Sequence, residues 1–125
     1  MQILYVDDDR INLMLFEHAC SAIAGVHLQT AADGSEALAA VQARRPDLMV
    51  IDLNLPDIDG HALLRALRVQ GGLADTPAFL CTAEHGARVH LAAMDAGFKG
   101  CWAKPVGQGD LIRELSMLGL APATE

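Results

Sequence analysis

The sequence predicts an α/β protein with three layers, in which helices cover both faces of a doubly wound, five-stranded parallel sheet. A short apolar run followed by a segment of helical periodicity recurs five times along the 125 residues. This alternation is typical of a parallel sheet with crossover helices. Apolar residues make up 52% of the chain and charged residues 20%, which allows a packed core in a chain of ordinary domain length. We therefore expect residues 1–125 to form a single domain with five helices.

The five apolar runs predict the strands. The run at 48–51 is apolar throughout, which indicates a buried central strand. The run at 26–30 alternates apolar and polar residues, which is typical of a sheet edge with one wet face. We expect strands at 2–6, 26–30, 48–51, 78–81 and 101–103.

The segments that follow these runs carry apolar residues at helical spacing, and most of them end at a residue that stops a helix. Gly25 ends the first segment and Pro46 ends the second. Gly71 follows the third segment, and Gly97 caps the fourth. We expect helices at 10–24, 34–45, 85–96 and 108–118, and one between the loop at 54–60 and Gly71.

The composition argues against several classes of protein. The net charge of −7 disfavours direct contact with nucleic acid or with an anionic membrane surface, because both need clustered cations. No apolar run approaches the roughly 20 residues of a membrane span, and the N-terminus lacks the basic and apolar pattern of a secretory signal. Cys20, Cys81 and Cys101 are widely scattered, which suits reduced thiols better than disulfides or a zinc site. We expect a cytoplasmic protein without membrane insertion.

Chemically reactive side chains follow four of the five predicted strands. They are Asp7, Asp8 and Asp9 after the first strand, Asp52 after the third, Thr82 after the fourth and Lys104 after the fifth. Ligands of open α/β sheets bind beyond the carboxyl ends of the strands, so we expect these groups to meet at one edge. Packed carboxylates resist joint ionisation unless a cation joins them, and Mg²⁺ prefers oxygen ligands. A carboxylate beside such a cation can act as a nucleophile toward phosphorus.

These segments resemble the receiver domains of two-component signalling, and the chemotaxis-type receiver in particular. The matching residues lie at 6–9, 51–60, 82–83 and 104–105, and the resemblance covers nearly the whole chain. It implies a flavodoxin-like fold with the strand order 2-1-3-4-5. It also implies a response regulator that takes a phosphoryl group from a histidine kinase or a histidine phosphotransfer protein and switches a downstream effector protein or domain. Such a protein is a phosphoacceptor switch, which catalyses only its own phosphorylation and dephosphorylation.

The resemblance implies a magnesium site. Asp8 and Asp52 would bind Mg²⁺ directly, and Asp7 would act mainly through a water molecule. Asn54 would contribute its backbone carbonyl as a further ligand.

The resemblance also assigns the groups that handle the phosphoryl group. Asp52 would accept it, Thr82 would bond one of its oxygens, and Lys104 would pair with Asp52 before the transfer and with the phosphoryl group after it. The bond between Lys104 and Pro105 would be cis, as in the family's usual turn.

Other positions of the family pattern concern lifetime, docking and output. Asn54 and Glu84, two residues past the acceptor and the threonine, are the chemotaxis-type pair, so we predict comparatively fast self-dephosphorylation. Ile11 and Met14, on the first helix, are candidates for docking the phosphodonor. The output surface would be formed by the fourth helix, the fifth strand and the fifth helix. Cys101 stands where the family usually has Tyr or Phe. In the family this aromatic side chain rotates inward and reports phosphorylation to a partner, and the present chain lacks it at this position.

Several polar residues have simpler interpretations. We expect Asp9, Asp57 and Asp59 to be turn or helix-cap residues rather than ligands. Trp102 is expected to pack at an edge strand. The histidines show no ligand spacing, and we expect them on the surface or partly buried; they are His18, His27, His61, His85 and His90.

Other functions remain open at this stage. The chain is either a stand-alone regulator or a piece of a larger regulator or hybrid histidine kinase. A receiver that only binds partners and is never phosphorylated is a second class, although such modules typically lack the acceptor, a metal-binding acid or the lysine. A flavin-binding relative would need a Ser/Thr/Gly-rich phosphate loop after the first strand. A phosphatase with an aspartate nucleophile would want Asp where this chain has Asn54.

Overall fold

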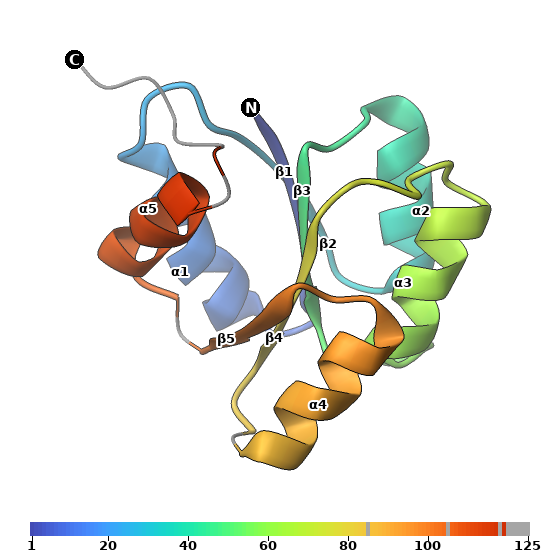
Figure 1. The fold of residues 1–125 in the computed structure, drawn as a ribbon. Helices are drawn as coiled ribbons and strands as arrows, with labels where there is room; N and C mark the ends of the chain where they lie inside the picture. Colours follow the sequence, from blue (N-terminus) through green and yellow to red (C-terminus); the bar gives the residue numbers. More distant parts are fainter. Residues whose placement is uncertain (85, 105, 118, 120–125) are drawn as a thin grey trace.

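The computed structural model describes residues 1–84, 86–104, 106–117 and 119 (Figure 1). Five parallel strands form one sheet in the order β2-β1-β3-β4-β5, as the fold class and strand order had predicted. The strands are β1 (Gln2–Val6), β2 (His27–Ala31), β3 (Leu48–Asp52), β4 (Ala78–Thr82) and β5 (Gly100–Ala103). The helices are α1 (Arg10–Ser21), α2 (Gly34–Ala43), α3 (Gly60–Val69), α4 (Ala87–Ala96) and α5 (Gln108–Met117).

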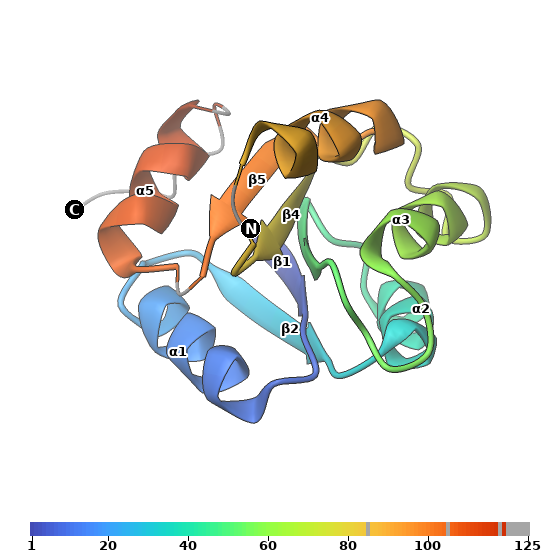
Figure 2. The same cartoon turned by 90° about the horizontal axis from the view of Figure 1, so that it is seen from below.

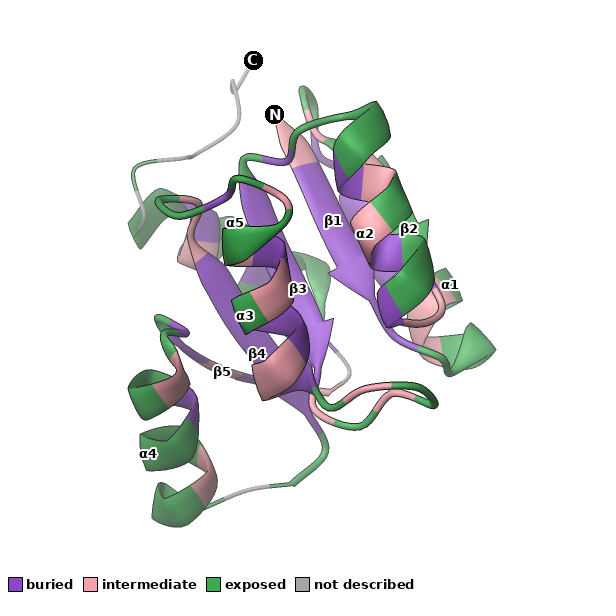
Figure 3. Cartoon of the chain, turned by 90° about the vertical axis from the view of Figure 1, so that its right-hand side faces the viewer, coloured by how far each residue is buried: buried purple, intermediate pink, exposed green. Residues whose placement is uncertain are grey.

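The helices form the two outer layers. Seen from below the molecule, α1 and α5 lie on one side of the sheet, and α2, α3 and α4 lie on the other (Figure 2). Side chains along a strand alternate between the faces, so β1 serves both layers. Leu4 and Val6 pack toward α2–α4, whereas Ile3 and Tyr5 pack toward α1 and α5. The inner strands β1, β3 and β4 are therefore buried almost throughout (Figure 3).

Strand boundaries differ from the predicted ones by one residue in several places. β2 covers His27–Ala31 instead of 26–30, because its ladder with β1 pairs His27 with Gln2 and Ala31 with Val6. β3 and β4 each extend one residue further than predicted. Asp52 and Thr82 are consequently the last residues of their strands, so the sheet itself orients their side chains.

Two helices end earlier than predicted. α1 stops at Ser21 rather than 24; Ile23 is buried and its N–H donates to the carbonyl of Cys20 in a tighter turn that ends at Gly25, whose φ is +82°. α2 stops at Ala43 rather than 45. Arg44 is already extended, and Arg45 precedes Pro46, a position at which helical conformation is disfavoured.

The other helix boundaries are close to the expected ones. α4 begins at Ala87, after Gly86 with a φ of +122°, and His85 lies outside the described residues, as does Leu118 beyond α5. None of the helices in the described part of the chain is both long and apolar enough to cross a membrane.

Candidate functional site

The carboxyl ends of four parallel strands, β1, β3, β4 and β5, bring the predicted groups to one edge of the sheet. Asp7 follows β1, Asp52 and Thr82 end β3 and β4, and Lys104 follows β5. The strands are in register, with Val6 beside Ile51 and Asp52 beside Cys81. The structure therefore brings Asp7, Asp52 and Lys104 into direct contact and places Thr82 at the same edge of the sheet, at the end of the neighbouring strand.

Lys104 links two of the carboxylates. Its Nζ lies 2.8 Å from Oδ2 of Asp7 and 2.9 Å from Oδ1 of Asp52. Burial alone would lower the pKa of Lys104, but the bonds to Asp7 and Asp52 outweigh it and raise that pKa. Burial raises the pKa of Asp52, and the neighbouring ammonium opposes this rise. The arrangement holds the Asp52 carboxylate beside a cation, with 7% of the residue exposed.

Asp7 is fully buried and its carboxylate is held at both oxygens. Oδ1 accepts the backbone N–H of Asp9 at 2.9 Å. Oδ2 accepts the Tyr5 hydroxyl at 2.8 Å as well as the Lys104 ammonium. Burial, with further contributions from Cys81 and Asp7, raises the pKa of Tyr5 far above its ordinary value, so its hydroxyl remains a donor. Sequence reasoning did not identify Tyr5; its position two residues before Asp7, on the same face of the strand, was the available signal.

The acidic residues at this edge fit a divalent cation. Asp7, Asp8 and Asp52 each offer a carboxylate oxygen, and the three oxygens lie within 4.8 Å of one another. Asp8 is exposed to solvent, whereas the other two are buried. Three carboxylates face one ammonium, so the cluster retains negative charge, and hard oxygen donors of this kind suit Mg²⁺.

The loop after β3 is folded back onto the strand. The N–H of Gly60 donates to the carbonyl of Leu53 at 2.7 Å, and Asn54 pairs with Asp59 in an isolated bridge. A Cβ at Gly60 would lie 2.5 Å from the carbonyl oxygen of Asp52, so only glycine allows this close approach. The fold-back keeps Asn54 next to the end of β3.

Thr82, Asn54 and Glu84 are linked to one another. The Thr82 hydroxyl accepts the backbone N–H of Glu84 at 3.1 Å, and the Asn54 amide donates to Glu84 Oε2 at 3.3 Å. The pair at 54 and 84 therefore meets at the protein surface beside the buried Thr82.

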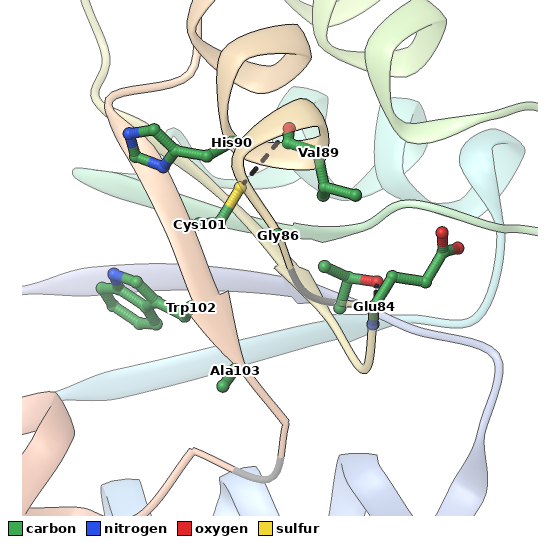
Figure 4. A pocket seen from close by; sticks show the side chains of 8 residues that line it. Glu84, Gly86, Val89, His90, Cys101, Trp102 and Ala103 are labelled. Atoms are coloured by element: carbon green, nitrogen blue, oxygen red, sulfur yellow. Dashed lines mark hydrogen bonds between the residues drawn. The ribbon is translucent and has the colours of Figure 1, made fainter.

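Cys101 lies on the face of β5 that is turned toward α4 (Figure 4). Its thiol is 3.9 Å from the carbonyl of Val89 and lines a cavity of about 210 Å³ that extends to Thr82 and Glu84. Trp102 packs on the opposite face, with its ring 4.7 Å from that of Phe79, which confirms its assignment to edge-strand packing. A small side chain thus occupies the position where the family usually has an aromatic ring.

The residues expected to be caps do cap helices. Asp9 accepts the N–H of Ile11 at the start of α1, and Asp59 accepts the N–H of Ala62 at the start of α3. Asp57 accepts the N–H groups of Gly34 and Ser35 at the start of α2, and this pairing lowers its pKa. Among the described residues, Asp7, Asp8 and Asp52 are the acidic, histidine or cysteine side chains that cluster as a metal site would require.

The remaining predicted positions are on the surface or outside the described residues. Ile11 and Met14 on α1 are 68% and 59% exposed. His18, His27 and His90 are exposed and His61 is partly buried, as predicted. His85 and Pro105, with the bond expected to be cis, lie outside the described residues.

The fold and the site together define a class of small α/β signalling domain with an aspartate–lysine cluster at the carboxyl edge of its sheet. The family model of the response regulator receiver domain matches residues 3–116, and the chain belongs to this family. It is therefore a receiver domain of a response regulator in two-component signalling.

Individual relatives agree with this assignment. The chain is 32% identical over 117 residues to the transcriptional regulatory protein PrrA of Mycobacterium tuberculosis, covering 94% of this chain and 49% of that protein. It is 34% identical over 118 residues to the response regulator MprA of Mycobacterium avium, covering 94% of this chain and 50% of that protein. The chain thus spans about half the length of these relatives. The structure of the chemotaxis response regulator CheY4 of Vibrio cholerae superposes with a TM-score of 0.83 at 31% identity, covering 94% of this chain and 97% of that one.

Proposed function

We propose that residues 1–125 form one receiver domain that accepts a phosphoryl group on Asp52 in a Mg²⁺-dependent reaction. The donor would be a phosphohistidine of a histidine kinase or of a phosphotransfer protein. The observation that carries this proposal is the Lys104 ammonium, 2.9 Å from the Asp52 carboxylate, beside a cluster of carboxylates that fits a divalent cation. The protein would thus be a switch that modifies itself rather than an enzyme that turns over other substrates.

In the proposed transfer, a carboxylate oxygen of Asp52 forms a bond to phosphorus as the bond from phosphorus to the donor nitrogen breaks. The electron pair of that bond stays on the departing imidazole. Asp8, Asp52 and the backbone carbonyl of Asn54 would hold Mg²⁺, with Asp7 next to it. When bound, the cation offsets the charge of the phosphoryl oxygens.

Lys104 and Thr82 would receive the transferred group. The added charge is about −1.5 to −2, and it would draw the Lys104 ammonium away from Asp7 toward a phosphoryl oxygen. The Thr82 hydroxyl, which accepts the Glu84 N–H, would turn to donate to another oxygen. These shifts would bias a pre-existing equilibrium at the α4–β5–α5 surface, where an effector protein or domain would bind.

Two surface features support partner docking and a short phosphoryl lifetime. Ile11 and Met14 present exposed apolar side chains on α1, close to the carboxyl edge, where a phosphodonor would approach. Asn54 and Glu84, bonded to each other at 3.3 Å, flank the acceptor and would orient a hydrolytic water. We expect self-dephosphorylation to be comparatively fast.

Intact-mass spectrometry after incubation with acetyl phosphate and Mg²⁺ tests the proposal. We expect one added phosphoryl group. It should be absent when the metal is chelated before acetyl phosphate is added, and absent in Asp52→Asn. Asp57→Asn, which removes a carboxylate from the same loop, is the matched control and should be phosphorylated. An unmodified wild-type chain would instead favour a receiver that only binds partners. A phosphoryl lifetime of many hours in Mg²⁺ would contradict the role given to Asn54 and Glu84.

A further inference from the structure

Tyr5 shares a carboxylate oxygen with the lysine of the site. Its hydroxyl donates to Oδ2 of Asp7 at 2.8 Å, and the Nζ of Lys104 lies 2.8 Å from the same oxygen. We propose that Tyr5 is a positioning residue that keeps Asp7 bonded and in place when Lys104 moves from Asp7 to the phosphoryl group. This inference rests on the proposed phosphoacceptor function.

The Tyr5 side chain is held rigidly. Tyr5 is 2% exposed and its ring stacks on Phe16, with ring centroids 4.1 Å apart and an interplanar angle of 3°. The backbone of β1 is bonded on both sides, to β2 and to β3. The hydroxyl is thus a fixed donor, unlike the ammonium of Lys104 at the end of a flexible four-carbon chain.

The position of the hydroxyl matters because a single ammonium serves two carboxylates. Lys104 bonds both Asp7 and Asp52, but a phosphoryl group on Asp52 would compete for the ammonium. Asp7 is fully buried, and a buried carboxylate oxygen that loses its donor is costly. The Tyr5 hydroxyl would remain on Oδ2 throughout, which lowers the cost of the lysine's movement.

The proposed role predicts that the variant Tyr5→Phe keeps its affinity for Mg²⁺ but loses affinity for beryllium trifluoride. Mg²⁺ binding, measured by calorimetry, does not require Lys104 to move, so its Kd should stay within about threefold of the wild-type value. Binding of beryllium trifluoride at saturating Mg²⁺ imitates the phosphoryl group and does require the movement. We expect its affinity, and the rate of phosphorylation by acetyl phosphate, to fall roughly tenfold, since the lost bond is to a charged group.

Phe16→Leu is the matched control for packing. It disturbs the ring on which Tyr5 stacks but keeps the hydroxyl, so it should lower the Tm and leave the affinity for beryllium trifluoride within about threefold. If Tyr5→Phe lowers the Tm and weakens the binding of Mg²⁺ and of beryllium trifluoride by the same factor, the role of Tyr5 is merely structural and the proposal is overturned. Unchanged beryllium trifluoride binding would overturn it as well.

A second measurement needs no variant. Tyr5 is the only tyrosine of the chain, so 3-fluorotyrosine introduces a single ¹⁹F probe on the ring carbon next to the one that bears the hydroxyl. We expect its resonance to move when beryllium trifluoride is added at saturating Mg²⁺, because the other donor on Oδ2 leaves. A resonance that does not move overturns the proposal. If the wild-type chain neither binds beryllium trifluoride nor is phosphorylated, the proposed function itself fails, which is a separate outcome.

Discussion

The three thiols of the chain differ in their access to solvent. Cys20 and Cys81 are buried, and burial raises the pKa of each to about 12. Cys101 is only partly buried and lines the cavity beside α4, although burial raises its pKa too. Because the thiolate is the reactive form, these differences should decide which thiol reacts in the folded protein.

We predict that Ellman's reagent at pH 8 labels one thiol of the folded chain, slowly, and three after unfolding in guanidinium. Cys101→Ser should abolish the reaction of the folded protein, while Cys20→Ser should leave it unchanged. Rapid labelling of two or more thiols under native conditions would contradict the buried environments of Cys20 and Cys81.

At the level of single residues, the sequence identifies groups more readily than it identifies their contacts. The positions of Asp52 and Lys104 could be predicted because each follows an apolar run, and parallel strands end at a common edge. That Tyr5 shares Oδ2 of Asp7 with Lys104 could not be predicted, since it depends on side-chain rotamers and on the register between strands. The roles assigned to these residues in phosphoryl transfer stay predictions.

Asp57 connects the loop after β3 to a different element, the helix α2. Its two carboxylate oxygens accept the N–H groups of Gly34 and Ser35, at 2.9 and 3.1 Å, at the N-terminus of α2. A negative charge at this end of a helix is favourable. The pairing with Gly34, then with Ser35, lowers the pKa of Asp57 below its ordinary value.

The lowered pKa fixes the sign of a pH dependence. A carboxylate whose pKa is lower in the folded state stabilises that state above the unfolded pKa, about 4, and this stabilisation is lost as the pH falls through the folded pKa. We predict that Asp57→Asn lowers the urea midpoint by a constant amount from pH 5 to 8, and that the difference from wild type shrinks below about pH 4. Asp95→Asn, on exposed α4, is the control. A difference that grows toward low pH would contradict the assignment.

Element boundaries show where local patterns lose their predictive value. The apolar runs located all five strands. Burial in the sheet centre favours continuous apolar residues in the inner strands, and the edge strand β2 was found from its alternating pattern. The end of α1 was missed by three residues, since Ile23 turns into the core instead of continuing the helix. Likewise, nothing in the sequence indicated that Arg68 on α3 would donate to the carbonyls of Leu73, Thr76 and Gly97. Such bonds depend on how loops pack, which periodicity does not report.

At the scale of the whole molecule, the fold concentrates negative charge at the carboxyl edge of the sheet. The chain carries a net charge of −7, and the parallel sheet brings three carboxylate oxygens within 4.8 Å of one another. Lys104 neutralises part of this charge through its bonds to Asp7 and Asp52. The strand order thus places Asp7, Asp8 and Asp52 where their carboxylates repel one another, and a bound divalent cation would reduce this repulsion.

A ligand that binds only the folded state raises its stability, by about 2.7 kcal/mol when its concentration is 100 times the Kd. For a domain of this size, Mg²⁺ at that concentration should raise the Tm by roughly 10 °C. Asp8→Ala should lose this increase, yet without Mg²⁺ it should melt no lower than the wild type, because one repelling carboxylate is gone. Scanning calorimetry with and without Mg²⁺, against NaCl at equal ionic strength, measures both effects. An equal increase with NaCl would mean that general screening, and not a site built from Asp7, Asp8 and Asp52, relieves the repulsion.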